Sequence, residues 1–174
     1  MSIYPRGFEM ANEYKVNVGD QCPVFTLKDQ NGNTFVSDEL FEAPAIIYFY
    51  PRDDTPGCTK EACEFRDALE RFNDLEVRVL GISTDSVESH KKFSDKYELN
   101  FSLLSDEDHQ VAEAFDVWQS KMMYGLLKKG VIRATFIIDG EGTICFIERP
   151  AKVNGQVERL LSAVREYANI EPQE

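Results

Sequence analysis

A continuous apolar run at residues 45–50, AIIYFY, constrains the fold of this chain more than any other feature. The run is too short for a helix of normal length and ends at Pro51, which suits a central strand buried on both faces of a sheet. Beyond it, residues 59–73 place apolar side chains three and four positions apart, the spacing of an amphipathic helix. The sequence therefore predicts a buried strand, a loop and a helix that begins at Cys58.

Strands and helices alternate along the rest of the chain. The predicted elements are a hairpin of residues 25–27 and 33–36 around an Asn-Gly turn, strands at 45–50, 77–83 and 101–104, helices at 59–73, 86–97 and about 108–114, a second hairpin of 134–138 and 143–147, and a last helix at about 153–168. Residues 115–130 show no clear period, so we expect an irregular connection there. This order predicts an α/β fold, with a central mixed β-sheet flanked by helices, right-handed crossovers and an N-terminal β-hairpin.

Length and charge narrow the classes of protein. A chain of 174 residues fits a flexible extension of residues 1–15 followed by a single domain of residues 16–174. The formal net charge of −12 repels nucleic acid and anionic membranes at long range, so neither is an expected partner. The chain has no run of the ~20 apolar residues that a membrane span needs and no N-terminal secretory signal, so we expect a soluble, cytoplasmic protein.

Cys58 is the candidate nucleophile. A helix start offers unpaired backbone N–H groups and the positive end of the helix dipole, both of which favour a thiolate, the attacking form of cysteine. Pro56 fixes the chain as it enters the helix, and Gly57 allows another group to approach the backbone closely. The alternative is a small hydrophobic residue at a helix start.

Cys63 is the candidate partner for Cys58. On an α-helix, five residues of separation place the two Cα atoms ~8.6 Å apart. A disulfide needs Cα atoms within about 7 Å, so the two cysteines cannot bond while the helix is intact. If Cys63 does react with an oxidised Cys58, the first turns of the helix must unwind. The alternative is a buried helix residue.

Other cysteine chemistry finds less support in the spacing. The chain has no Cys-x-x-Cys motif and no second pair of ligands at zinc spacing. A cysteine hydrolase would need a histidine base, and the only histidines, His90 and His109, lie in charged helical stretches that we expect to be exposed. Cys22 precedes a proline, and Cys145 alternates with apolar residues in a strand, so we interpret both as packing residues.

The motif Pro51-x-x-x-Thr55-x-x-Cys58 resembles the active-site motif of peroxiredoxins. The longer run of residues 48–63, YFYPRDDTPGCTKEAC, resembles the bacterioferritin comigratory protein or peroxiredoxin Q branch. The similarity extends over most of the chain but not over residues 1–15 or the tail after about residue 170. It implies a thioredoxin-like fold.

The resemblance also implies roles for residues around the nucleophile. Thr55 would hydrogen-bond the thiolate and the peroxide, and Arg133 would stabilise the thiolate and polarise the O–O bond. Pro51 would shield the pocket from water, and Glu61 would orient the arginine. Such donors suit the reaction, because negative charge develops on the leaving oxygen of the peroxide.

By the same resemblance, Cys58 is the peroxidatic cysteine and Cys63 the resolving one. Cys58 would attack hydrogen peroxide or an organic hydroperoxide and become a sulfenic acid, which Cys63 would convert to an intramolecular disulfide. Thioredoxin, glutaredoxin or another dithiol protein would reduce that disulfide. No metal, haem or flavin cofactor is implied, and we expect a monomer or weak homodimer. The rival hypothesis is a binding module regulated by the same disulfide, against which the pair Thr55 and Arg133 argues.

Overall fold

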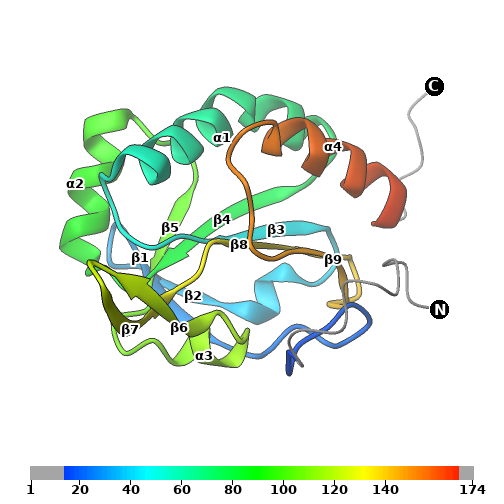
Figure 1. The fold of residues 1–174 in the computed structure, drawn as a ribbon. Coiled ribbons are helices and arrows are strands. Elements are labelled where there is room, and N and C mark those ends of the chain that lie inside the picture. Colours follow the sequence, from blue (N-terminus) through cyan, green and yellow to red (C-terminus); the bar gives the residue numbers. More distant parts are fainter. Residues whose placement is uncertain (1–13, 169–174) are drawn as a thin grey trace.

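A computed structural model describes residues 14–168 of the chain (Figure 1). Its strands are β1 (Thr26–Asp29), β2 (Thr34–Val36), β3 (Ala45–Phe49), β4 (Arg78–Ser83), β5 (Ser102–Ser105), β6 (Trp118–Met123), β7 (Leu126–Val131), β8 (Ala134–Ile138) and β9 (Ile144–Glu148). Its helices are α1 (Pro56–Asp74), α2 (Val87–Tyr97), α3 (Gln110–Ala114) and α4 (Gln156–Tyr167), with a short 3₁₀ helix at Ser37–Leu40.

Seven of the strands form one mixed sheet in the order β2-β1-β5-β4-β3-β8-β9. The central strand β3 runs parallel to β4 and antiparallel to β8, and β4 runs parallel to β5. The N-terminal hairpin pairs β1 with β2, and the late hairpin pairs β8 with β9 at the other edge. The predicted mixed sheet and its two hairpins are therefore confirmed.

The sheet is covered on both faces, which explains the continuous apolar run of β3. All five β3 residues are buried, and successive side chains of a strand point to opposite faces. Ile46 and Tyr48 pack in a cluster with α1 and α4, which lie together over one face in Figure 1. Ile47 and Phe49 pack in a second cluster on the other face, which includes α3 residues.

The prediction of an irregular connection at residues 115–130 is wrong, because β6 and β7 form a separate two-stranded hairpin. Its turn consists of Tyr124 and Gly125, both with positive φ, at 53° and 76°. Two left-handed residues match the twist of a tight hairpin, but Tyr-Gly is a weaker signal than Asn-Gly. The tip of the hairpin is exposed, so its strands need no alternation of apolar and polar residues.

Several element boundaries differ from those predicted by one to three residues, and two of them concern the helices at the site. Helix α1 begins at Pro56, so Cys58 lies inside its first turn, and α4 begins at Gln156. Most of the predicted flexible extension lies outside the described residues, although Lys15 is described and its backbone donates to Asp116. Among the described residues, no helix combines the length and the apolar character that crossing a membrane requires.

Candidate active site

Cys58 lies in the first turn of α1, where backbone N–H groups have no partner within the helix. Thr55 is the N-cap residue and Pro56 occupies the first turn, which suits proline because its missing N–H would be unpaired there anyway. The Cys58 side chain is only 2% exposed. The sulfur is therefore buried at the positive end of the helix dipole, the end that attracts negative charge.

Arg133, in the short connection between β7 and β8, joins Cys58 to Glu61. Its Nη2 lies 3.3 Å from the Cys58 sulfur, and its Nη1 lies 2.5 Å from Oε1 of Glu61. A Cβ atom on Gly57 would lie 3.3 Å from Nη2, so glycine leaves the room that the guanidinium occupies. The structure thus brings together three of the residues that the sequence singled out.

Burial shifts the pKa values of Glu61 and Arg133. It raises the pKa of Glu61 to about 7, although the charge and hydrogen bond of Arg133 oppose the rise. Glu61 is 1% exposed, and its Oε2 has no hydrogen-bond partner among the described residues. Burial alone would lower the pKa of Arg133, but Glu61 and Cys58 together raise it. Glu61 therefore titrates near neutral pH beside a permanent cation.

A second cation, Lys121 on β6, lies within electrostatic reach of Cys58. Its ammonium donates to the Val131 carbonyl oxygen at 2.7 Å. Burial lowers the pKa of Lys121, whereas Cys58 raises it and Arg133 lowers it. Sequence reasoning missed this residue, because it lies in the segment predicted to be irregular.

Thr55 and Pro51 lie in the loop between β3 and α1. The Thr55 hydroxyl donates to the Arg52 carbonyl oxygen at 3.0 Å, so in this structure it braces the loop. Its predicted bond to the thiolate stays a prediction. Pro51 is half-buried at the start of the loop, and its shielding role also stays a prediction.

Asp53, in the same loop, is held by a buried network that sequence reasoning missed. Its carboxylate accepts hydrogen bonds from the hydroxyls of Tyr50 at 2.6 Å and Ser89 at 2.8 Å. The same carboxylate lies 2.7 Å from Nδ1 of His90. The Asp53 backbone N–H donates to Asp85 at 2.9 Å. These hydrogen bonds therefore hold the loop against the connection between β4 and α2 and against helix α2.

The prediction that His90 is exposed is wrong, because its side chain is fully buried. Its Nε2 lies 3.0 Å from the Leu104 carbonyl oxygen, which can only accept, so Nε2 carries a hydrogen. Its Nδ1 faces the Asp53 carboxylate. The spacing of His90 to the buried Phe93, three residues on, was the available signal. His109 is half-buried and stacks on Trp118.

Asp53, Asp85 and His90 also offer ligand atoms within 4.8 Å of one another, as a small metal site would. The Asp53 oxygens already accept from Tyr50 and Ser89, and Asp85 accepts from Ser83 at 2.6 Å. Each of these groups has protein partners, so the cluster needs no cation to satisfy it. We assign it to holding the loop.

Cys63 lies on α1, half-buried, and the cysteines at 22, 58, 63 and 145 are all free thiols. Burial raises the pKa of Cys22 and of Cys145 to about 12, so both thiols stay protonated at neutral pH. This agrees with their interpretation as packing residues.

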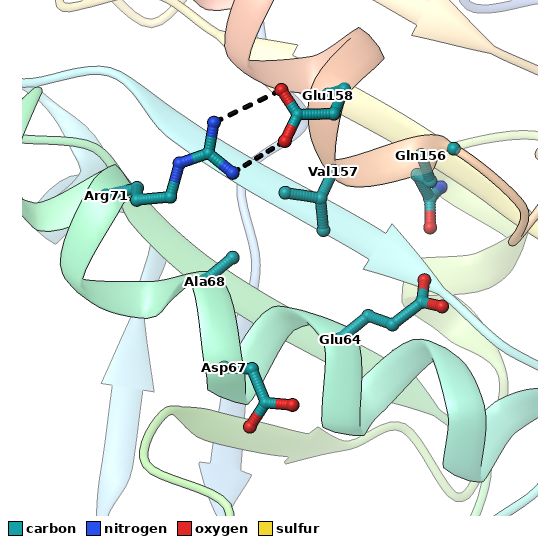
Figure 2. Close-up of a pocket in the computed structure, with 8 residues that line it drawn as sticks. Glu64, Asp67, Ala68, Arg71, Gln156, Val157 and Glu158 are labelled. Atoms are coloured by element: carbon teal, nitrogen blue, oxygen red, sulfur yellow. Dashed lines mark hydrogen bonds and ion pairs between the residues drawn. The ribbon is translucent and has the colours of Figure 1, made fainter.

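The later turns of α1 are tied to α4 and to the end of α2. Figure 2 shows Arg71 making two hydrogen bonds to the Glu158 carboxylate, at 2.6 and 3.1 Å, across a hollow between α1 and α4. The hollow is lined by residues from both helices and by none of the predicted site residues: Glu64, Asp67, Ala68, Arg71, Gly155, Gln156, Val157 and Glu158. Arg66 donates to the Tyr97 carbonyl oxygen at 2.7 Å. Cys58 and Cys63 both precede these ties.

Known proteins are similar to this chain in sequence and in fold. Residues 18–147 match the model of the AhpC/TSA family. The chain is 41% identical to peroxiredoxin Bcp of Bacillus subtilis (strain 168) over 153 residues, which are 88% of this chain and 98% of that protein. It is 40% identical to peroxiredoxin Bcp of Escherichia coli (strain K12), with the same coverage.

Solved structures of similar proteins have the same fold as this chain. The bacterioferritin comigratory protein of Xanthomonas campestris matches with a TM-score of 0.81 and 34% identity, covering 90% of this chain and 100% of that chain. A peroxiredoxin Q mutant of Xylella fastidiosa matches with a TM-score of 0.83 and 33% identity, covering 88% and 98%. These neighbours confirm the predicted thioredoxin-like fold. With its cysteine at a helix start beside Arg133, the chain belongs to the AhpC/TSA family and is a peroxiredoxin, a thiol-dependent peroxidase.

Proposed function

We propose that Cys58 is the peroxidatic nucleophile and that Arg133 stabilises its reaction. The observation that carries this proposal is the guanidinium that contacts both the Cys58 sulfur and Glu61. A fixed cation beside the sulfur favours the thiolate and is in position to receive charge from a peroxide. Glu61 holds one side of the guanidinium, so that the other side stays directed at the sulfur.

In the first step, the Cys58 thiolate attacks the terminal oxygen of ROOH. An S–O bond forms, the O–O bond breaks, and the leaving oxygen departs with the electron pair and takes up a proton as ROH. The sulfur is left as a sulfenic acid. Arg133 and the backbone N–H groups at the start of α1 stabilise the leaving oxygen, Thr55 positions the peroxide, and Pro51 limits the access of water.

In the second step, Cys63 attacks the sulfenic acid, which forms the disulfide and releases water. This step requires α1 to unwind, because an intact helix holds the two Cα atoms ~8.6 Å apart. The ties of Arg66 and Arg71 to neighbouring helices favour unwinding that stops before these residues. On the N-terminal side of Cys58, the buried hydrogen bonds of Asp53 hold the loop between β3 and α1 in place.

The substrate and partner follow from the relatives. The bacterioferritin comigratory protein of Xanthomonas campestris has alkyl peroxide reduction activity. We extend this activity to the present chain, together with hydrogen peroxide, and assign recycling to thioredoxin or a similar dithiol protein. Four free cysteines suit a reducing cytoplasm. We propose a monomer or weak homodimer.

Stopped-flow rates of peroxide reduction test the proposal. Wild type and the variants Cys58→Ser and Arg133→Ala are mixed with hydrogen peroxide and with an alkyl hydroperoxide. Loss of the reaction in C58S is expected, with a decrease of about 10²–10³ in R133A. Cys145→Ser is the matched control and should react like the wild type. Equal rates in all four proteins would contradict the enzymatic role and leave only a redox-regulated module.

A further inference from the structure

The β6–β7 hairpin carries an exposed apolar tip. Met122, Tyr124, Leu126 and Leu127 are 67%, 99%, 59% and 69% exposed. The other large apolar side chains that are exposed in the described part of the chain are spread between residues 24 and 41. These four side chains lie within six residues at the end of the hairpin, with Leu126 on the face of Lys121 and with Met122 and Leu127 on the other face. Exposed apolar side chains gathered in this way are typical of an interaction site. We call these four residues the hairpin tip.

Positive charge accompanies the hairpin tip. Residues 117–138 contain four basic residues and no acidic residue, in a chain with a formal net charge of −12. Three of the four are Lys121, Lys128 and Lys129 of the hairpin, with Lys121 directly opposite Lys128. Lys128 and Lys129 are exposed. The segment therefore presents a basic, apolar surface on an acidic protein.

This surface adjoins the peroxidatic cysteine. Lys121 lies within electrostatic reach of Cys58 and Arg133, and Figure 1 shows the hairpin at the same end of the molecule as the start of α1. Because side chains alternate along a strand, Leu126 and Lys128 share the face of Lys121. A protein bound to the hairpin would therefore stand next to the turns that must unwind.

We propose that the hairpin tip, with Lys128 and Lys129, is the docking surface for an acidic dithiol protein that reduces the Cys58–Cys63 disulfide. This inference rests on the proposed function. A thiolate of the bound protein attacks one sulfur of the disulfide, which forms a mixed disulfide and releases the other sulfur as a thiolate. The second thiol of the partner then breaks the mixed disulfide. The enzyme leaves as a dithiol, and the partner leaves as a disulfide with two electrons fewer.

Charge argues for this occupant over two others. A second copy of the chain, docked tip to tip, would bring two sets of lysines together, and like charges facing one another destabilise strand pairing. An anionic membrane would meet the overall charge of −12, which repels it at long range. An acidic protein meets the same long-range repulsion over a much smaller area than a membrane does, and at contact it can place its acidic groups beside the lysines and an apolar face against the hairpin tip. This short-range attraction to the lysines would weaken with salt.

Two assays on one set of variants test the inference. Peroxide turnover is driven either by thioredoxin, with its reductase and NADPH, or by dithiothreitol. The variants are Lys128→Glu with Lys129→Glu, and Leu126→Ser with Leu127→Ser. The matched control, Lys91→Glu with Lys92→Glu, makes the same change of charge at exposed positions of α2.

Both hairpin variants are expected to raise the KM for thioredoxin about tenfold, with dithiothreitol-driven turnover within about twofold of wild type. The ratio of the KM of the lysine variant to the KM of the wild type should fall between about 0.01 M and 0.3 M salt, because salt screens the attraction between the lysines and the partner. The control variant should behave like the wild type.

An unchanged KM for thioredoxin in both hairpin variants overturns the docking surface and leaves the proposed function standing. An equal loss in both assays also overturns it, because the hairpin would then act on the cysteines. A wild-type dimer in sedimentation that the lysine variant dissociates assigns the surface to a second copy instead. Failure of the wild type to reduce peroxide with dithiothreitol overturns the proposed function itself.

Discussion

Arg133 reaches the Cys58 sulfur with Nη2, at 3.3 Å, while its Nη1 is held by Glu61. The cation comes from the connection between two strands and the thiol from a helix start, 75 residues away in the sequence. One planar group makes both contacts, which a lysine ammonium on a flexible stem cannot reproduce.

Arg133→Lys therefore tests the geometry rather than the charge. We expect the second-order rate constant with peroxide to fall about 10²–10³ in stopped-flow measurements, because the fork that contacts sulfur and carboxylate together is lost. Arg71→Lys, in an exposed ion pair between α1 and α4, is the control and should change the rate less than about twofold. A lysine variant as fast as the wild type would show that any cation suffices.

Glu61→Gln should change how stability depends on pH. The folded-state pKa of about 7 lies above the ordinary value of 4.5, so the folded protein keeps a proton between these values that the unfolded chain has lost. The stabilising contribution of this group is complete below pH 4.5 and is lost as the pH rises through 7.

Urea unfolding at about pH 5 and about pH 8 measures this effect. The wild type should lose up to about 3 kcal/mol more than Glu61→Gln between the two conditions. Identical pH dependence in the two proteins would mean that the carboxyl of Glu61 titrates normally.

Asp53 and His90 form a buried pair that holds the active-site loop. Replacing one partner, as in Asp53→Ala or His90→Ala, leaves the other buried without its partner and should lower the free energy of unfolding by about 3–5 kcal/mol. Lys91→Ala, which breaks the exposed Lys91–Asp95 pair of the same helix, should cost less than about 1 kcal/mol. The double variant should lose less than the sum of the single losses, because the two residues act together. Additive losses would contradict the pairing.

Cys63→Ser should separate the two steps of turnover. The variant is expected to react with the first equivalent of peroxide at the wild-type rate, because Cys63 takes no part in that step. Intact-protein mass spectrometry should then show one added oxygen at Cys58 and no disulfide. Continued turnover with a protein dithiol at the wild-type rate would assign resolution to another thiol.

The sequence predicted a helix or strand best where the burial of that element produces a clear pattern of apolar residues. Strand β3 is buried on both faces, so its sequence is a continuous apolar run. Helix α1 is buried on one face, so its apolar residues recur at helical spacing. The hairpin with Tyr124 at its turn was missed because its tip is exposed, and its turn lacks the common Asn-Gly or Asp-Gly pair.

Site residues were predictable only where a motif carries them. Cys58 was predicted from its place at a helix start, and Glu61 and Arg133 only from the family resemblance; the structure brings the three together. Asp53 and His90 are 37 residues apart and meet only through the packing of α2 beside the loop, so no local pattern links them. Helical spacing could have shown that His90 is buried, but not which group it meets.

Hydrogen exchange with peptide-level mass spectrometry, before and after one equivalent of peroxide, decides whether α1 unwinds during turnover. In the oxidised protein we expect a Cys58–Cys63 disulfide and a loss of amide protection in α1 from residue 56 to about residue 65. Protection should persist from Arg71 onward, where α1 is tied to α4. A disulfide from Cys58 to Cys22 or Cys145, or full protection of α1 in the oxidised protein, would contradict this mechanism.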